Sequence, residues 1–167
     1  MANDTNIKSR FFGTNAAGTQ ITASSDTNLA AEQDPADGAN LTLAALATNG
    51  AMCGQGFAQQ IRLVSGAGDD NSDVTYTVIC TDGMGNSITE DITGPTGGAT
   101  VNSVLFYHTI VSITGNGAAS VDITAGVLIT GIHAEIWGGR TRLRGMHGVI
   151  ATADTFLFKN TSSTGDN

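Results

Sequence analysis

The chain has 167 residues, 13% of them charged, and a net charge of −8 at neutral pH. This length favours one domain that can fold without a metal or a disulfide. The acidic balance argues against a free-standing nucleic-acid-binding protein, which usually carries a basic face. No run approaches the roughly 18 apolar residues of a membrane span. Residues 1–20 lack the apolar core of a secretory signal. We therefore expect no nucleic-acid partner, no membrane partner and no secretion.

Residues 1–40 are polar and contain few large apolar side chains, with Phe11 and Phe12 as their only aromatic pair. A segment of this composition buries too little apolar area to fold by itself. We predict an extended N-terminal arm over residues 1–40, anchored locally or ordered by a partner. Residues 41–47 form a short run of Ala and Leu that suits either a helix or a strand. We favour a strand there, followed by a turn.

From residue 61 onward, short runs rich in β-branched residues alternate with turns rich in Gly, Asn and Asp. Residues 61–65 predict a strand, and residues 74–81 predict a second one. In the second strand Val74, Tyr76, Val78 and Cys80 share one face, which is apolar and is predicted to face the core. Residues 82–86 predict a hairpin loop.

The strand that returns from this hairpin is predicted to lie near a sheet edge. Glu90 shares a face with Ile88 and Ile92, and an inward or rim charge is typical of edge strands because it discourages unwanted pairing. Residues 101–114 are long for one straight strand, so we predict a bend or a bulge within them.

Further strands are predicted at residues 121–123 and 127–137, the second with a bulge at Gly131, and a last pair at residues 142–152 and 155–160. Strands at this spacing predict an all-β fold: an antiparallel β-sandwich or a jelly-roll-like barrel with an extended N-terminal arm. The sandwich domain is predicted over residues 41–160, and a flexible tail over residues 161–167.

Two cysteines and three histidines are the candidate metal ligands. Cys53 and Cys80 are expected to be reduced, buried thiols. His108, His133 and His147 are far apart in the sequence, so a site that combined them with a cysteine would have to be assembled by the fold. No metal site is expected from these residues.

The acidic loop at residues 69–73 partly matches a calcium-binding loop, with oxygen-bearing side chains at alternate positions. It lacks the Gly that should follow, where Val74 stands, and the distal Glu. The loop is interpreted as a solvated acidic turn, with a hard-cation site as the alternative.

Catalytic patterns are missing from the sequence. Gly115-Asn116-Gly117 resembles the start of a dinucleotide-binding fingerprint, but Ser120 replaces the third Gly and a strand is predicted to follow. Glu90 and Asp91 are adjacent, so on a strand they point to opposite faces and cannot flank one substrate bond. We expect no enzyme activity and no cofactor.

The segment 139–145 concentrates positive charge. It holds Arg140, Arg142 and Arg144, three of only seven cationic residues. Alternate residues of a strand share a face. The three arginines are interpreted either as a solvated strand face or as a contact for an acidic partner. Bare phosphate binding is a third alternative, which the negative charge of the whole chain disfavours.

Residues 74–95, followed by residues 104–114 and 115–126, resemble a pattern in structural proteins of tailed bacteriophages. The pattern is a strand followed by a Gly- and Asn-containing turn, a second strand and Gly-Pro. The residues that carry it are Thr81, Asp82, Gly85, Asn86, Ile88, Glu90, Ile92, Gly94 and Pro95, then Phe106, Ile110 and Ile113. Cys80 stands where the pattern has Gly, and residues 142–152 look like the strand that often follows. The resemblance covers the chain from about residue 60 onward and includes no catalytic residue.

The resemblance implies a virion component, best fitted by a capsid decoration or cement protein that stabilises the assembled head. The implied partners are the major capsid protein and further copies of the chain, as a homo-oligomer such as a trimer. The implied location is the capsid surface, after synthesis in the host cytoplasm. Under this hypothesis Phe11 and Phe12 anchor the arm, and Arg140, Arg142 and Arg144 form a charged contact.

Two alternatives remain open. The first is a tail, head-to-tail or fibre-base module of the virion. The second is a β-sandwich that binds host glycans, although aromatic residues are only 5% of the chain and Trp137 is its one tryptophan.

Overall fold

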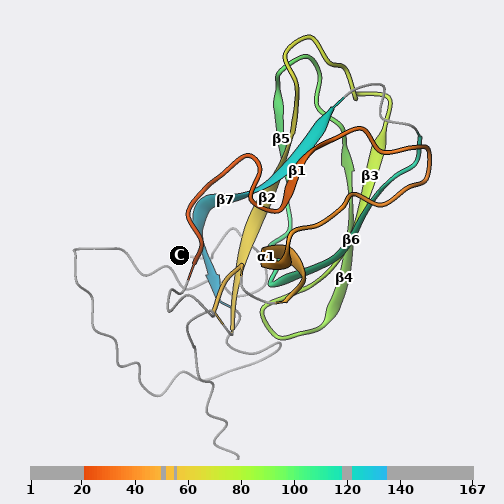
Figure 1. Ribbon diagram of the computed structural model, residues 1–167. Helices are drawn as coiled ribbons and strands as arrows, with labels where there is room; N and C mark the ends of the chain where they lie inside the picture. The colour runs from red at the N-terminus through yellow and green to blue at the C-terminus, as the bar shows by residue number, and fades with distance from the viewer. Residues whose placement is uncertain (1–20, 50–51, 55, 118–121, 135–167) are drawn as a thin grey trace, which may run out of the picture. The chain divides into compact units, whose positions relative to one another are not determined.

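The computed structural model describes residues 21–49, 52–54, 56–117 and 122–134 (Figure 1). These residues form one short helix and seven strands. The elements are β1 (Ala30–Gln33), α1 (Ala45–Thr48), β2 (Phe57–Ser65), β3 (Thr75–Thr81), β4 (Ser87–Thr93), β5 (Thr100–Asn102), β6 (Thr109–Gly115) and β7 (Ile123–Ala134). The predicted all-β fold is confirmed.

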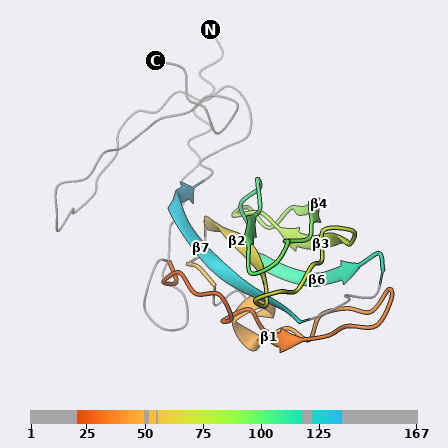
Figure 2. The same cartoon turned by 90° about the horizontal axis from the view of Figure 1, so that it is seen from above.

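The described strands form two antiparallel sheets. One has the order β1-β7-β2-β5 and the other has the order β4-β3-β6. Figure 2 shows β7 beside β2 in the first sheet, and β3, β4 and β6 together in the second. Both sheets contribute side chains to one apolar core, so the arrangement is the predicted antiparallel sandwich. β4 is an edge strand, as the position of Glu90 predicted.

The core follows from the alternation of apolar residues along the strands. On β3, Tyr76, Val78 and Cys80 are fully buried, which confirms the predicted core face. Ile61 on β2 and Val127 on β7 are fully buried in the opposite sheet. Burial of a Val or Ile side chain stabilises a fold by about 1.5–3 kcal/mol, so these strands hold the two sheets together.

Residues 21–40 belong to the domain, so the boundary predicted at residue 40 is wrong for this half of the arm. β1 pairs with β7, and Leu29 and Ala30 have no exposed surface. The side-chain amide of Gln33 makes two hydrogen bonds with the backbone of Thr42: it accepts from the Thr42 N–H at 2.7 Å and donates to the Thr42 carbonyl at 3.2 Å. These bonds fix the end of β1 to the segment that follows. The burial of this segment could not be predicted from the sequence, because its few apolar residues are isolated among polar ones.

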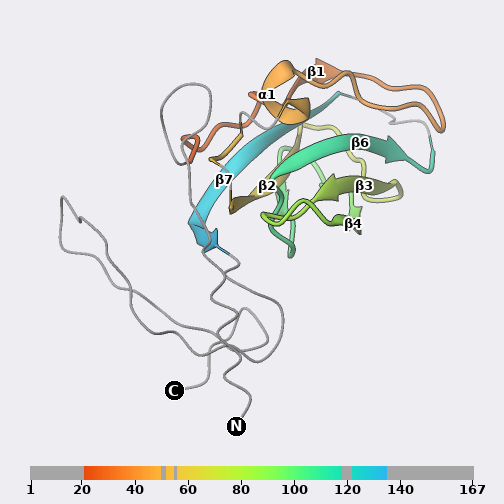
Figure 3. The ribbon, with the colours of Figure 1, turned by 90° about the horizontal axis from the view of Figure 1, so that it is seen from below.

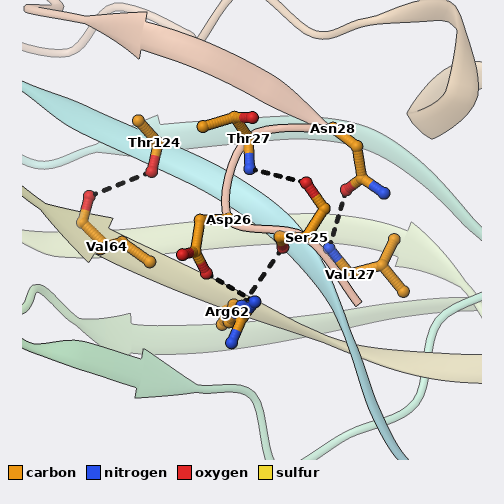
Figure 4. A network of polar contacts seen from close by, with 8 residues as sticks. All are labelled: Ser25, Asp26, Thr27, Asn28, Arg62, Val64, Thr124 and Val127. Atoms are coloured by element: carbon orange, nitrogen blue, oxygen red, sulfur yellow. Dashed lines mark hydrogen bonds and ion pairs between the residues drawn. The ribbon is translucent and has the colours of Figure 1, made fainter. Parts of the chain in front are cut away.

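Residues 25–28 lie across β7 and are held there by polar contacts from both ends (Figure 4). Ser25 donates its backbone N–H to the Val127 carbonyl at 3.0 Å, and Asn28 Oδ1 accepts from the Val127 N–H at 3.0 Å. Arg62 pairs with Asp26 at 2.6 Å and donates Nε–H to the Ser25 carbonyl at 3.2 Å.

This crossing requires a glycine in β7. A Cβ added to Gly126 would lie 1.8 Å from the Ser25 carbonyl oxygen, well inside van der Waals contact. Gly126 therefore permits the close approach of the crossing segment to the strand.

The strand predicted at residues 41–47 is not formed. Leu41 is buried and donates its N–H to the Ile113 carbonyl at 2.8 Å, and the chain then turns into α1. α1 packs beside β6 (Figure 3). The Ala-rich end of the run favours a helical turn, and docking against β6 stabilises it.

Two further predictions about strand boundaries are wrong. Residues 101–114 are divided between β5 and β6, which lie in different sheets, so the run is two strands joined by a link. The predicted irregularity is nevertheless present within the run, at Val111 of β6, where the pairing with β3 shifts by one residue. Residues 121–123 and 127–137 were expected as separate strands, but β7 runs continuously from Ile123 to Ala134. Its pairing with β2 changes register between Leu128 and His133, where the bulge at Gly131 was predicted. The predicted strands at residues 142–152 and 155–160, and the tail at residues 161–167, lie outside the described residues.

Candidate functional site

Residues 103–108, which we call the strap, connect the two sheets beside the edge formed by β4 and β5. Ser103 donates its N–H to the Ile61 carbonyl at 2.9 Å, and Tyr107 exchanges two backbone hydrogen bonds with Gln59 at 2.8 and 2.9 Å. At its end, His108 donates its N–H to the Thr81 carbonyl on β3 at 2.7 Å. The strap is thus fixed to both sheets by backbone bonds.

Glu90 holds the middle of the strap. Its carboxylate accepts hydrogen bonds from the N–H groups of Val104 at 2.7 Å and Leu105 at 2.9 Å, and from the Tyr107 hydroxyl. Tyr107 is fully buried. Burial, followed by its bond to Glu90, raises the pKa of the Tyr107 hydroxyl far above its usual value. Glu90 therefore serves as a fixed acceptor for three donors of the strap.

The strap presents an apolar tip to solvent. Val104 is 76% exposed and Leu105 is 38% exposed. Because their backbone N–H groups are bonded to Glu90, the two side chains are presented on a fixed scaffold. The tip was not predicted from the sequence, because both residues lie within the run at residues 101–114 that was expected to form one long strand. The sequence signal that pointed to the tip was Glu90. A carboxylate on an otherwise apolar strand face requires hydrogen-bond donors from a neighbouring segment.

The fold brings Cys53 and His108 together, although they are 55 residues apart in sequence. The thiol lies 3.4 Å from His108 Nδ1, and both groups lie 3.1 Å from the Phe57 carbonyl oxygen. That oxygen can only accept, so Nδ1 carries a proton toward it and has no lone pair for the thiol proton.

Cys53 therefore lacks the base that a nucleophilic cysteine requires. Burial raises the pKa of its thiol to about 12, whereas a reactive cysteine has a lowered pKa. The Cys53 thiol and the His108 ring both bond the Phe57 carbonyl oxygen, so the pair has a structural role: it connects the strap to the residues around the start of β2.

Cys80 has a similar environment in the core. Its thiol donates to the Ile88 carbonyl at 3.4 Å, and burial raises its pKa to about 12. Both cysteines are free and buried, which confirms the prediction of buried, reduced thiols.

The hairpin loop 82–86 is built around one carboxylate. Asp82 accepts hydrogen bonds from the N–H groups of Met84 and Asn86, each at 2.8 Å, and from the Asn86 side-chain amide at 2.8 Å. Gly85 has a φ of +86°, which a residue with a side chain rarely adopts. Both carboxylate oxygens of Asp82 therefore accept hydrogen bonds from residues of the loop, and these bonds close the predicted hairpin.

The acidic loop at residues 69–73 is organised by local contacts. Asp70 accepts a hydrogen bond from the Ser72 N–H at 2.9 Å, which lowers the pKa of its carboxyl group. Asn71 is fully buried, and a Cβ at Gly94 would lie 2.2 Å from its carbonyl oxygen. Within the described part of the chain, no three His, Cys, Asp or Glu residues are grouped as a metal site would require.

The contact residues predicted from the sequence lie outside the part of the chain that the structure describes. Phe11, Phe12, Arg140, Arg142 and Arg144 all lie outside the described residues, so their roles stay predictions. The side chain of His133 and the whole of His147 do as well.

Comparison with known proteins identified no relative: no family model, no curated protein and no solved structure matches this chain. Among the residues that the structure describes, no helix is long and apolar enough to span a membrane.

Proposed function

We propose that this chain is a structural protein of a tailed-phage virion, a decoration or cement protein that binds the assembled head. The observation that carries the proposal is the use that the fold makes of the phage-like pattern. Its polar residues and glycines have structural roles in and around the β3–β4 hairpin. Asp82 and Gly85 shape the loop, Glu90 holds the strap, and Gly94 admits the backbone of Asn71.

A pattern of this kind supports a scaffold more than a reaction. The single Cys–His contact within the described residues has the wrong proton arrangement for catalysis. The strap offers instead a rigid apolar tip, and rigid apolar anchors favour protein–protein contact because little side-chain freedom is lost on binding.

The charge distribution also supports a docking role for the terminal segments. Residues 21–134 carry eleven carboxylates and one guanidinium, that of Arg62, so their net charge is −10. The other six cations lie in residues 1–20 and 135–167, three of them at Arg140, Arg142 and Arg144. Under the proposal these segments bind acidic surface on neighbouring subunits of the head, with Phe11 and Phe12 as apolar anchors.

The mechanism is a shift of an assembly equilibrium. A protein that binds the assembled head, and not its separate subunits, stabilises the assembled state by mass action. The partners are the major capsid protein and other copies of this chain, and the location is the outer surface of the head.

The position of the chain on particles tests the proposal. A label on the chain is expected all over the head of the phage that encodes it. A label confined to one vertex would favour a tail or head-to-tail module. Particles that lack the chain altogether would refute a virion role.

The contact residues are tested by a variant in which Arg140, Arg142 and Arg144 are all changed to Ser. It is expected to lose most of its binding to purified heads, and the loss should shrink as salt is raised. Lys159→Ser is the matched control because it removes a cation from the same terminal segment outside the cluster. Equal binding by the triple variant and the control would contradict the assigned contact.

A further inference from the structure

The solvent-facing side of the β4-β3-β6 sheet is the surface with the most distinctive composition among the described residues. We call it the outer face. Its residues are Thr75, Thr77, Ile79 and Thr81 on β3, Ser87, Thr89, Asp91 and Thr93 on β4, and Thr109, Val111, Ser112 and Thr114 on β6. None of the twelve is buried.

The outer face is nearly free of charge on a strongly acidic domain. It holds one carboxylate, Asp91, while residues 21–134 carry eleven. Glu90, the neighbour of Asp91, points the other way and is bonded to the strap. Of the remaining carboxylates, Glu32 lies on β1 in the other sheet, and the others lie in loops, including Asp122 just before β7. Depletion of charged residues is typical of the centre of a protein–protein interface.

Two exposed aliphatic side chains lie near the middle of this surface. Ile79 on β3 is 40% exposed, and Val111 on β6 is 62% exposed. Ile79 pairs with Ser112, and Val111 is the extra residue where the pairing of β3 with β6 shifts. They are two of the four large apolar side chains exposed within the described ranges, and the other two form the tip of the strap.

Several polar groups of the outer face already bond one another. Thr77 donates its hydroxyl to Asp91 at 2.7 Å. The hydroxyls of Thr81 and Thr109 are hydrogen-bonded across the strands, and Thr114 donates to Asn40 at the rim. Polar groups that are satisfied within the surface lose less when water is removed, so this face can be covered at a low desolvation cost.

We infer that the outer face binds a second copy of this chain through a symmetric, two-fold contact. Two copies of a domain with a net charge of −10 repel each other. They can approach most closely where each presents the fewest carboxylates, which is the outer face. A cationic partner would gain more from the acidic loops than from this surface.

Two-fold symmetry also keeps the carboxylate of Asp91, the one charge on the outer face, away from its counterpart in the second copy. A two-fold axis that passes by Ile79 in the plane of the contact reverses the strand order when it runs along the strands, and the strand direction when it runs across them. In both cases Asp91 of one copy lies over hydroxyl-bearing positions of the other, and not over the second Asp91. Like charges are thereby kept apart, and hydroxyl donors face each carboxylate.

The contact is expected to be weak. Seven residues along each strand and three strands side by side span about 23 by 14 Å. This footprint is well below the roughly 800 Å² that each partner buries in a standard stable interface. Dissociation should therefore be observed within the range from micromolar to millimolar protein.

Sedimentation equilibrium of the full chain over this concentration range tests the inference. The unmodified protein is expected to associate reversibly, and Val111→Glu to weaken association at least about tenfold because it places a charge at the centre of the contact. Thr89→Glu, on the same face but on the exposed edge strand, is the second variant and should act in the same direction. Thr100→Glu is the matched control for Thr89→Glu, since it adds the same charge to an exposed threonine of β5, which lies in the other sheet, and it should associate as the unmodified protein does.

Raising the salt from about 0.1 M to about 1 M should strengthen association, because screening reduces the repulsion between the two acidic domains. A protein that stays monomeric at millimolar concentration would overturn the inference, as would association that Val111→Glu and Thr89→Glu leave unchanged. The inference does not depend on the proposed virion role. Loss of self-association and loss of head binding are separate measurements, so either can fail without the other.

Discussion

The carboxylate of Glu90 on β4 accepts a hydrogen bond from the hydroxyl of Tyr107, a fully buried residue of the strap that pairs with β2. This contact joins the free edge of one sheet to a segment held by the other. It makes an edge-strand carboxylate part of the connection between the two layers, and it explains why a charged residue alternates with isoleucines on the inward side of β4.

Glu90→Gln is expected to lower the free energy of unfolding by about 1–3 kcal/mol. A carboxylate accepts from all three donors, whereas an amide replaces one oxygen by an NH₂ group that faces a donor. At least one of the N–H groups of Val104 and Leu105 then loses its acceptor. Urea unfolding followed by circular dichroism measures the change.

Asp91→Asn is the matched control for this prediction. It makes the same chemical change at the next residue of β4, where the side chain is exposed and accepts a hydrogen bond from the Thr77 hydroxyl. Its effect should stay below about 0.5 kcal/mol, as is usual for surface substitutions. Equal effects of the two variants would contradict the role given to Glu90.

Gly126→Ala is expected to destabilise the domain by about 1–3 kcal/mol or more, because the added methyl group would overlap the Ser25 carbonyl oxygen. The crossing segment would have to lift, which would also disturb the bonds of Ser25 and Asn28 to Val127. Gly97→Ala serves as the comparison because a Cβ there meets nothing within 4 Å. Thermal unfolding that places both variants at the same midpoint would disprove the close approach.

Both thiols should be unreactive in the folded protein at neutral pH. Cys53 and Cys80 have no exposed surface, and burial raises the pKa of each thiol to about 12. The thiolate that attacks a disulfide reagent is therefore scarce and inaccessible. We expect an aromatic disulfide reagent to detect two thiols in denaturant and almost none in native buffer. Rapid reaction of one thiol in native buffer would show that its burial is incomplete.

Stability should fall at alkaline pH. Burial raises the pKa of Cys53 and Cys80 from 9.0, and that of Tyr76 from 10.0, to about 12 in the folded protein. A raised pKa means that the folded state binds the proton more tightly than the unfolded state does. The corresponding stability is complete below about pH 9 and is lost progressively up to about pH 12.

The measurement is the urea midpoint as a function of pH. We expect a plateau below this window and a decline within it, in parallel with ionisation of Tyr76 seen in the ultraviolet spectrum. An unchanged midpoint through the window would contradict the burial of these groups.

The parts of the fold that the sequence predicted are those with a local signal. The period-two alternation from Val74 to Cys80 and the turn at Asp82–Asn86 are readable because strand faces and turn residues are determined over a few positions. Glu90 was correctly placed near an edge for the same reason. Its hydrogen-bond partners could not be predicted. Val104 and Tyr107 lie in the strap, which exists only because residues 101–114 are divided between strands of two different sheets.

The Cys53–His108 contact and the inclusion of residues 21–40 in the domain depend on long-range packing. Nothing near Cys53 in the sequence indicates a neighbour 55 residues away. Leu29 and Ala30 are isolated apolar residues whose burial is decided by β7. The outer face is an intermediate case. Its alternating threonines are visible in the sequence. That they lie on one side of the sheet, and that this side carries little charge, becomes clear only from the register of the three strands.

Deletion of residues 1–33 should destabilise the domain severely, by several kcal/mol. It removes β1, the buried side chain of Leu29 and the segment that lies across β7, and loss of one buried leucine alone costs about 2–5 kcal/mol. Deletion of residues 1–20 is the comparison, since it removes none of the contacts described for β1 or for residues 25–28. Calorimetry should show a cooperative transition near the original temperature for the shorter deletion, and a lowered or absent one for the longer. If both deletions unfolded at the same temperature, residues 21–33 would have to be an arm after all, and the domain would begin at residue 41 as its sequence suggested.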